Sequence, residues 1–424
     1  MKRQVSFPYY PNIGSLEIGE ENLIGVFEPR STVTDVPAET LIKRAFENPI
    51  GSPRISELAA KASNALVIVD DYTRKTPVKE VLSCLIPELN AAGITNENIT
   101  ILIALGTHRP MKEEEMVSKF GAEYCRSLKI INHNWKDTES LADFGQTEEG
   151  TRVQVNKAVL ESEFVFGIGQ IVPHRIAGFS GGGKIIQPGI CGPETTAQTH
   201  WRSALFNGAE VLGVADNPVR LEIERVAAKA GLAAIANAVC DADGRLIDMF
   251  VGDPVAAHRV GAELSRRVYG VKIPEQADIL VIDSYPMDIE LWQGAKALYA
   301  GELAVKQGGI AILISPCPEG VSQTHHLILK EGYRHSWETI ARVESGEIDD
   351  KIVAAHLVRV GRVIKDNGKG ILVSNGISQR DTEKLGFMYA ATPQIALDKA
   401  FEIMGQDASV TILQRGGTAL PVVG

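Results

Sequence analysis

Long apolar runs are absent from this sequence of 424 residues. No run reaches the roughly 18 to 20 apolar residues that cross a bilayer, and the basic start MKRQVSFPYYPNIG lacks the apolar stretch of a signal peptide. Positive charge is also scarce, since 43 Lys and Arg face 53 Asp and Glu for a net charge of −10. We therefore expect no membrane partner and no nucleic-acid partner, because a polyanion needs a basic surface.

Cysteine is rare as well, with five residues and no C-x-x-C pair. An odd, widely spaced set in a long chain excludes a disulfide framework and a zinc ribbon, and it indicates reduced thiols in a cytoplasmic protein. A hydrophobic content of 44% nevertheless excludes a largely disordered chain. The cysteines are Cys84, Cys125, Cys191, Cys240 and Cys317.

Apolar strand-like runs alternate with helical patterns along the chain, which is typical of an α/β fold. The length exceeds what one core usually fills, so we expect two α/β domains with a cleft between them. A linker-like segment, VKIPEQAD, places the boundary between residues 1–271 and residues 272–424. The second domain is predicted to be a small doubly wound parallel-sheet, Rossmann-like domain that closes the cleft, with the last roughly 15 residues free to pack back on the first domain.

The predicted elements follow from the two hydrophobic periods. The expected strands are 65–69, 99–105, 164–172, 277–283, 309–315, 370–375 and 408–414, and the expected helices are 78–92, one starting near 112, 219–230, 254–269, 291–307, 349–364 and 393–404.

Four polar motifs directly follow predicted strands. Because ligands bind outside the carboxyl ends of parallel strands, we expect these four turns to face one cleft. The motifs are DDYTRKTP from Asp70, GTHRP from Gly106, PHRIAGFSGGGK from Pro173 and DSYPMDIELWQGAK from Asp283.

The third motif comes close to a phosphate-binding loop. Gly178 to Lys184 satisfies G-x-x-x-x-G-K, but Ile185 replaces the hydroxyl residue that would hold Mg²⁺. Pro188 falls inside the helix that such a loop should start. A phosphate-loop hydrolase is therefore disfavoured, and a glycine-rich hinge remains an alternative. Consecutive glycines still expose backbone N–H groups to an anion.

Three histidines lie in polar or glycine-rich segments of the sequence. His108 and His174 each follow a strand and precede an Arg, and such a pair can take and return protons on two sides of one substrate. His200, in TTAQTHW, is a candidate metal ligand. A zinc site built from all three is conceivable, although no H-x-x-x-H spacing supports it. Each of these histidines could instead serve as a structural hydrogen-bonding residue.

Two further places suit an anionic ligand. Arg74 follows Asp71 at a strand-to-helix turn and offers a fork for a carboxylate or phosphate, unless the two residues only lock the turn. Gln293 and Lys296 are spaced i, i+3 and share one helix face, which is also ordinary for a solvent-facing helix.

Together these motifs resemble the nickel-pincer nucleotide-dependent lactate racemase family, a family of 2-hydroxy-acid racemases and epimerases. The resemblance rests on DDYTRKTP, LGTHRPM, VPHRIAGFSGGGKIIQPGI, TTAQTHW and DIELWQGAKAL in this order. It implies a pyridinium-3,5-bisthiocarboxylic acid mononucleotide that holds Ni through sulfur, carbon and sulfur. It also implies that cofactor-biosynthesis enzymes are needed as partners.

The resemblance assigns roles residue by residue. Lys184 matches the covalent tether and His200 the protein ligand of nickel, while His108 and His174 match the acid/base pair. Arg74 and Lys296 match the positions that hold the substrate carboxylate. Asp71 and Gln293 match the residues that support them. The positions near the cofactor, including its phosphate, are Thr73, Ser180, Gly181, Gly182 and Gly183.

The resemblance implies an isomerase that inverts C2 of a 2-hydroxy acid by moving a hydride to the cofactor and back, through a 2-keto acid. Lactate, malate, aromatic hydroxy acids and sugar acids all remain candidate substrates. Trp292 and the loop Ser315 to His326 are candidate walls of the substrate pocket, or plain packing. The alternative function is a two-domain protein that binds a small carboxylate or a nucleotide without chemistry.

Overall fold

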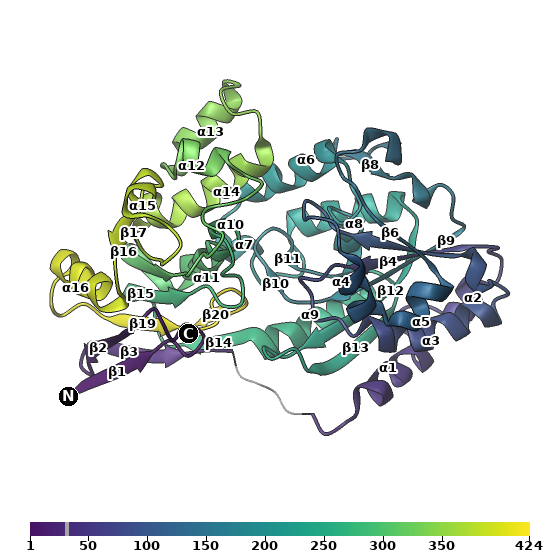
Figure 1. Cartoon of the computed structure of the whole chain (residues 1–424), viewed down its shortest axis with the longest axis horizontal. Helices are drawn as coiled ribbons and strands as arrows, with labels where there is room; N and C mark the ends of the chain where they lie inside the picture. The colour runs from purple at the N-terminus through teal and green to yellow at the C-terminus, as the bar shows by residue number, and fades with distance from the viewer. Residues whose placement is uncertain (30–33) are drawn as a thin grey trace. The chain divides into compact units, whose positions relative to one another are not determined.

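The computed structural model describes residues 1–29 and 34–424, which divide into two compact units (Figure 1). Each unit is built around its own six-stranded sheet, so the expected α/β class with parallel-sheet domains is confirmed. Unit 1 contains Met1–Arg30, Ser203–Leu212 and Tyr269–Gly424, and unit 2 contains Ser31–Arg202 and Gly213–Val268.

The sheet of unit 2 has the strand order β13-β12-β9-β4-β5-β6. All neighbours are parallel except β13, which is antiparallel to β12. Numbered along the chain from β4, the order reads 3-2-1-4-5-6 from β6 to β13, which is the doubly wound order of dinucleotide-binding sheets. The strands are β4 (Ala65–Asp70), β5 (Ile99–Ala104), β6 (Lys129–Asn132), β9 (Phe164–Gln170), β12 (Leu232–Cys240) and β13 (Leu246–Gly252).

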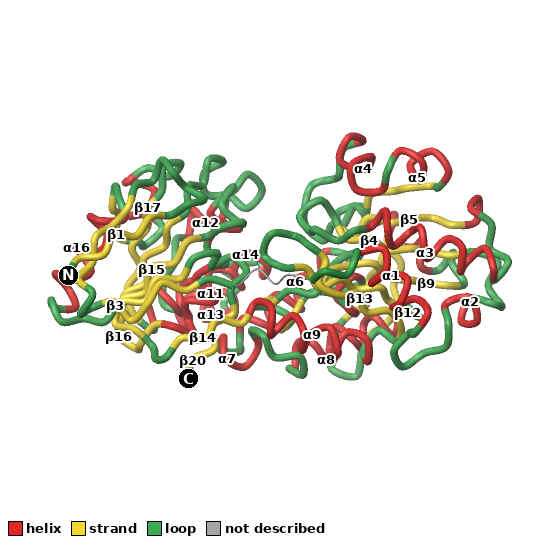
Figure 2. Tube along the Cα trace, turned by 90° about the horizontal axis from the view of Figure 1, so that it is seen from below, coloured by secondary structure: helices red, strands yellow, loops and turns green. Residues whose placement is uncertain are grey.

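Helices lie on both sides of this sheet (Figure 2). β4 reads ALVIVD and is buried along its whole length, as a central parallel strand covered on both faces must be. Val67 and Val69 pack on one face in a core shared with α1 and α3. The helices of unit 2 are α1 (Ala38–Glu47), α2 (Ile55–Leu58), α3 (Val78–Ala91), α4 (Glu113–Phe120), α5 (Ala122–Ser127), α8 (Pro218–Lys229), α9 (Ala256–Tyr269) and most of α6 (Pro193–Ala204).

Two small ribbons and a short 3-10 helix complete the elements of unit 2 that matter here. The ribbons pair β7 (Leu141–Gln146) with β8 (Arg152–Asn156), and β10 (Pro173–His174) with β11 (Gly178–Phe179). The 3-10 helix is η4 (Gly182–Ile185).

The sheet of unit 1 has the order β18-β17-β16-β15-β19-β3 and is parallel throughout. It is doubly wound around β15, as predicted for the C-terminal domain. Its strands are β15 (Ala277–Asp283), β16 (Val305–Ile314), β17 (Gly368–Val373), β18 (Met388–Ala390), β19 (Val410–Leu413) and β3 (Leu23–Phe27). The helices are α7 (Gly208–Val211), α10 (Leu291–Gly294), α11 (Ala297–Ala304), α12 (Leu327–Glu331), α13 (Ser336–Glu344), α14 (Lys351–Gly361), α15 (Gln379–Lys384) and α16 (Pro393–Met404).

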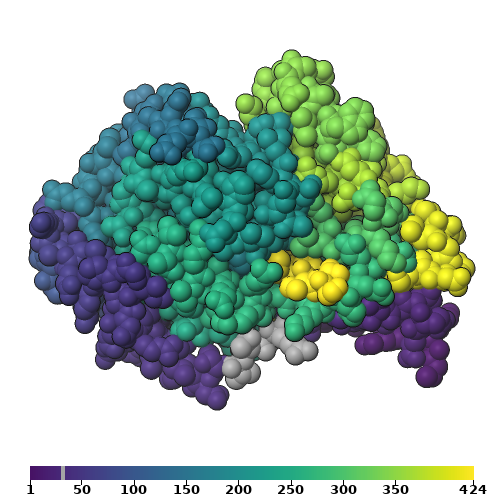
Figure 3. Space-filling model, turned by 180° about the vertical axis from the view of Figure 1, so that it is seen from behind, coloured from purple at the N-terminus to yellow at the C-terminus, as the bar shows by residue number. Residues whose placement is uncertain are grey.

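The division of the chain differs from a single boundary between residues 271 and 272. The N-terminal segment belongs to unit 1, where β3 pairs in parallel with β19. The hairpin of β1 (Lys2–Ser6) and β2 (Ser15–Gly19) packs against α16, as the purple and yellow surfaces of Figure 3 show. A local linker signal cannot reveal this, because the pairing joins residues about 390 positions apart.

The expected linker is itself a strand. β14 (Gly270–Ile273) pairs in parallel with β20 (Leu420–Val423), so the last strand of the chain belongs to unit 1. The helix expected over 291–307 is also divided into α10 and α11, because β16 already starts at Val305. Within residues 1–29 and 34–424, we find no helix whose length and apolar character would allow it to cross a bilayer.

Candidate functional site

The switch point of the unit 2 sheet lies between β4 and β9. Ligands bind at such points because the connections leave the two adjacent strands toward opposite faces. Three of the four predicted motifs follow β4, β5 and β9 here. Two hydrogen bonds join the first two motifs to residues that flank the third: Lys75 N–H donates to Gln170 Oε1 at 3.2 Å, and Gly106 N–H donates to the Gly189 carbonyl at 2.9 Å.

Asp71 and His108 form a close pair at this edge. The His108 Nδ1 lies 2.5 Å from Asp71 Oδ2, and Asp71 is 3% exposed. Burial alone would raise the pKa of Asp71, but the bonds from His108 and Thr73 and the charge of Arg74 outweigh it and lower that pKa well below its usual value. Asp71 is therefore a carboxylate, His108 Nδ1 carries a proton, and Nε2 is the basic nitrogen of the neutral ring.

The turn that follows β4 is fixed by Lys119 of α4. Its Nζ lies 2.8 Å from Asp70 Oδ1 and donates to the carbonyls of Asp71 and Arg74 at 2.8 and 3.3 Å. Thr73 Oγ1 donates to Asp71 Oδ1 at 2.6 Å. The guanidinium of Arg74 makes long contacts of 3.4 Å with Thr73, so its fork is not consumed by the expected lock with Asp71.

His174 lies on β10, directly after the predicted strand end. Its Nδ1 accepts a hydrogen bond from Ile176 N–H at 3.2 Å. Since a backbone N–H only donates, Nδ1 is unprotonated and the neutral ring carries its proton on Nε2. The two histidines therefore present opposite tautomers, with the lone pair on Nε2 in His108 and the proton on Nε2 in His174.

The glycine-rich turn is held by a buried arginine. Arg220 of α8 is fully buried and donates to the carbonyls of Ala177, Phe179 and Gly181. Burial lowers the pKa of Arg220 to about 10, which leaves it charged at neutral pH. His258 Nε2 lies 3.0 Å from the Ser180 carbonyl. These contacts fix the backbone that leads into Lys184.

The glycines of this turn serve packing as well as any ligand. A Cβ at Gly181, Gly182 or Gly183 would lie 2.5 to 2.9 Å from Asn237, His258 or Ala227. The Gly182 N–H already donates to Asn237 Oδ1 at 2.6 Å. The Ser180 hydroxyl donates to the Gln170 carbonyl at 2.6 Å and accepts from Val172 N–H at 3.0 Å. Ser180 and Gly182 thus hold the turn and have no donor to spare for a phosphate.

A phosphate-loop hydrolase does not fit this turn. η4 ends at Ile185, so the long helix that a phosphate loop opens is not formed. The glycines instead place Lys184 on the short 3-10 helix η4, which follows the turn after β9.

His200 lies on α6 in a form suited to a metal. Its Nδ1 is 2.9 Å from the Thr196 carbonyl, which only accepts, so Nδ1 is protonated and Nε2 carries the lone pair. No group of three or more His, Cys, Asp and Glu side chains in the described parts of the chain could hold a metal ion. The zinc alternative thus lacks a ligand set, whereas a metal that arrives with its own ligands needs one histidine. Lys184 and His200 fit such a group.

In unit 1, Gln293 and Lys296 meet as their spacing predicts. Lys296 Nζ donates to Gln293 Oε1 at 2.5 Å, although α10 and α11 are separate helices. The Trp292 ring packs against the rings of His325 and His356, at centroid distances of 4.1 and 4.6 Å. The backbone N–H of Trp292 donates to the Val321 carbonyl at 3.0 Å, so the loop 315–326 is bound to α10.

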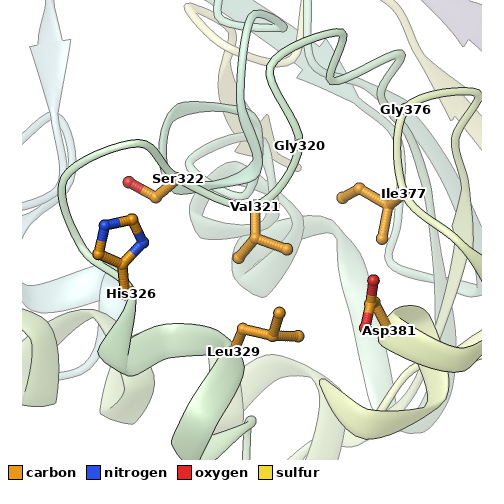
Figure 4. Close-up of a pocket in the computed structure, with 8 residues that line it drawn as sticks. All are labelled: Gly320, Val321, Ser322, His326, Leu329, Gly376, Ile377 and Asp381. Atoms are coloured by element: carbon orange, nitrogen blue, oxygen red, sulfur yellow. The ribbon is translucent and has the colours of Figure 1, made fainter.

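A cavity of about 220 Å³ lies beyond the carboxyl ends of β16 and β17. Figure 4 shows Val321 pointing toward Leu329, with His326 and Ser322 on one side and Asp381 on the other. None of the predicted catalytic, cofactor-binding or carboxylate-binding residues lines it, but four residues of the predicted wall loop 315–326 do. The loop that forms its wall is the loop bound to α10, so the cavity is a neighbour of Gln293 within unit 1.

Sequence reasoning missed the residues that support the site. Lys119, Arg220, Asn237 and His258 lie on strands and helices far along the chain from the motifs that they hold. Their only local signal is a polar residue within an apolar pattern, and that signal does not say which turn the residue reaches.

Comparison with known proteins identifies the chain. The model of the lactate racemase N-terminal domain matches residues 9–213, and that of the lactate racemase C-terminal domain matches residues 273–420. A lactate racemase of Thermoanaerobacterium thermosaccharolyticum is 32% identical over 321 residues, covering 74% of this chain and 75% of the relative. One of Lactiplantibacillus plantarum is 28% identical over 97% of this chain and 98% of its own.

A solved structure agrees. The lactate racemase apoprotein of T. thermosaccharolyticum superposes with a TM-score of 0.86 at 28% identity, covering 96% of this chain and 97% of the other. The fold and the relatives together show that this protein is an isomerase of the racemase class. The chain belongs to the lactate racemase family.

Proposed function

We propose that this racemase inverts C2 of a 2-hydroxy acid through a planar 2-keto acid, with a nickel-pincer nucleotide attached to Lys184 and ligated by His200. The relatives are named lactate racemases, so lactate is the first substrate to test. The observation that carries the proposal is the Asp71–His108 pair, which leaves a basic Nε2 at the switch point beside Arg74.

The C2–H proton of a 2-hydroxy acid is very weakly acidic, so its removal as a hydride avoids a carbanion. The bound cofactor supplies this chemistry by accepting the hydride and returning it. The chain has to bind the carboxylate and move the hydroxyl proton. We assign the carboxylate to Arg74 and Lys296, with Gln293 in support, since cations and an amide suit that group.

His108 takes the hydroxyl proton on Nε2 as the C2–H bond breaks, and this proton returns to the oxygen when the C2–H bond re-forms on the opposite face. The Asp71 carboxylate, 2.5 Å from Nδ1, stabilises the imidazolium that forms and prevents the ring from turning. Asp71 is held in place by the Thr73 hydroxyl, which donates to its carboxylate, and by Lys119, which donates to its backbone carbonyl.

His174 meets the substrate oxygen with Nε2–H in the tautomer described above, so it donates a hydrogen bond. To act as the base for the opposite enantiomer, its ring has to move the proton to Nδ1 and give up the bond from Ile176. The two histidines are therefore an unequal pair: His108 is already set as a base, and His174 has to be converted.

For the cofactor, Lys184 is the tether, His200 the nickel ligand, and Gly181 and Gly183 lie near the phosphate. Ser180, Gly182 and Thr73 hold their turns in place without contacting the phosphate, because their donors are occupied. For the compartment we propose the cytoplasm, where the five cysteines, all free of disulfides, stay reduced.

The test is production together with the cofactor-building enzymes, followed by intact mass and nickel analysis. Loaded protein is then incubated with a panel of 2-hydroxy acids, and inversion at C2 is read by chiral chromatography. We expect added mass on Lys184, nickel near one per chain, and inversion of at least one acid. A protein that stays unmodified under these conditions, or a loaded protein that binds the acids without inverting any, contradicts the proposal.

A further inference from the structure

A fully buried glutamine connects the two segments that carry Lys184 and His200. Gln187 lies three residues after Lys184 and is 0% exposed. Its Nε2 donates to the Thr199 hydroxyl and, at 3.3 Å, to the Thr195 carbonyl of α6. Thr199 directly precedes His200, so the amide contacts the turn of α6 from which the imidazole projects.

Each segment is held by hydrogen bonds of its own. Gln187 N–H donates to the Gly183 carbonyl at 3.1 Å, and Ile190 N–H donates to the Ile186 carbonyl at 2.9 Å. The α6 side is tied to β8, because Thr195 Oγ1 donates to the Arg152 carbonyl at 2.7 Å. The Gln187 amide therefore cross-links two segments that are each held by other hydrogen bonds.

The polar character of Gln187 has no other use among the described residues. Its Oε1 is buried and has no hydrogen-bond partner there, which costs free energy that a leucine would not cost. Thr199 Oγ1 still donates to the Thr195 carbonyl at 3.0 Å without Gln187, so no backbone acceptor depends on the amide. A buried polar contact with little stabilising value points to positioning.

We propose that Gln187 is a positioning residue that fixes the spacing between Lys184 and His200, so that one group can be attached to the first and ligated by the second. This inference rests on the proposed function. A group tethered at one end binds its second ligand with an effective concentration that depends on the spacing, and a variable spacing lowers it. Residues behind a metal ligand typically contribute about 10- to 100-fold in metal affinity.

The experiment compares nickel retention in loaded protein. Gln187→Leu removes the amide, Thr199→Val removes its acceptor with little change of shape, and Thr199→Ser keeps the hydroxyl. Thr382→Val is the matched control, because Thr382 of unit 1 is also 0% exposed and its hydroxyl has no hydrogen-bond partner among the described residues. Each variant is made with the cofactor-building enzymes, challenged with EDTA, and followed by intact mass, nickel content and visible absorbance over time.

We expect Gln187→Leu and Thr199→Val to keep the added mass on Lys184 but to release nickel roughly 10 to 100 times faster than wild type. Thr199→Ser and Thr382→Val should release it at the wild-type rate. Melting temperatures should stay close to wild type, which separates positioning from a purely structural role.

The outcomes distinguish the two proposals. Wild type without added mass overturns the proposed function and this inference together. Wild type with added mass, but with equal nickel release from Gln187→Leu and Thr199→Val, overturns only the role of Gln187. If Gln187→Leu folds poorly, the comparison of Thr199→Val with Thr199→Ser decides, since valine keeps the shape of threonine without the hydroxyl and serine keeps the hydroxyl.

Discussion

At the scale of single residues, Asp71 determines what His108 can do. Asp71→Asn keeps an oxygen near Nδ1 but removes the charge that stabilises the imidazolium. We expect kcat for racemisation to fall roughly 10²- to 10⁴-fold in both directions, because general-base catalysis through His108 is lost. Chiral assays on loaded protein measure this.

Intact mass is the control for Asp71→Asn. The Lys184 adduct and the nickel content should be unchanged, because Asp71 is assigned to proton transfer and not to the cofactor. Wild-type kcat in this variant would remove His108 from the role of base.

His133 makes the stability of unit 2 depend on pH. It is 1% exposed, its Nε2 donates to the Cys191 carbonyl at 3.1 Å, and burial lowers its pKa to about 4. Unfolded histidine takes up a proton below about pH 6.5, whereas the folded residue resists until about pH 4. Stability is therefore lost as the pH falls from about 6.5 toward 4, by about 2 kcal/mol between pH 7 and pH 5.

Urea unfolding at the two pH values checks this prediction. His133→Gln cannot titrate, so its stability should fall by about 2 kcal/mol less than that of wild type. Other buried histidines, such as His258 and His356, affect both proteins alike. The exposed His326 serves as the control in His326→Gln, which should follow wild type. An equal pH dependence in wild type and His133→Gln would contradict the assignment.

Candidate site residues could be predicted from the sequence where a polar motif follows a strand. The i, i+3 spacing of Gln293 and Lys296 predicted their contact, which exists even though the helix around them is broken. The opposite tautomers of His108 and His174 were not predictable. They depend on which atom faces each Nδ1, a carboxylate in one case and a backbone N–H in the other.

At the scale of elements, the glycine-rich turn depends on one helix. Arg220 of α8 supplies donors to three carbonyls of the turn. Arg220→Met leaves these carbonyls without that donor, and we expect unfolding free energy to fall by about 2 to 4 kcal/mol. Amides of residues 176–184 should exchange at least about tenfold faster in mass-resolved hydrogen exchange.

Arg220→Lys provides the comparison. A single ammonium cannot present the planar fork of a guanidinium, so lysine should restore the charge without restoring the protection of the turn. Full protection in Arg220→Lys would show that charge alone, and not the geometry of the fork, holds residues 177–181.

The central strands were predictable because each is a short, fully buried apolar run, as β4 illustrates. β14 was not, because GVKI has no pattern that distinguishes a strand from a linker. Its identity depends on pairing with β20, about 150 residues away, and local periodicity carries no information about such a partner.

At the scale of the whole molecule, the chain crosses between its units more than once. The sequence indicates two α/β domains, and two α/β units exist, but residues 1–29 complete the sheet and core of unit 1. Phe7, Tyr10, Leu16 and Ile18 are buried there with residues of β15 and β16. Their apolar pattern is visible in the sequence, yet the sheet that it covers lies more than 250 residues further along the chain.

This arrangement predicts that unit 1 depends on the N-terminus and unit 2 does not. Leu16 is 1% exposed, so Leu16→Ala should lower the stability of unit 1 by about 2 to 5 kcal/mol. Deletion of residues 1–29 removes an edge strand and at least four buried apolar side chains, each worth about 1.5 to 3 kcal/mol, and should leave unit 1 unfolded.

Hydrogen exchange during a urea titration reports each unit separately, and β4 and β5 should keep their wild-type midpoint in both variants. Leu160 of unit 2 is 65% exposed, so Leu160→Ala should change neither unit. Because the core of β4 and β5 is built from residues of unit 2 alone, a parallel loss of protection in both units would mean that the chain folds as one cooperative body.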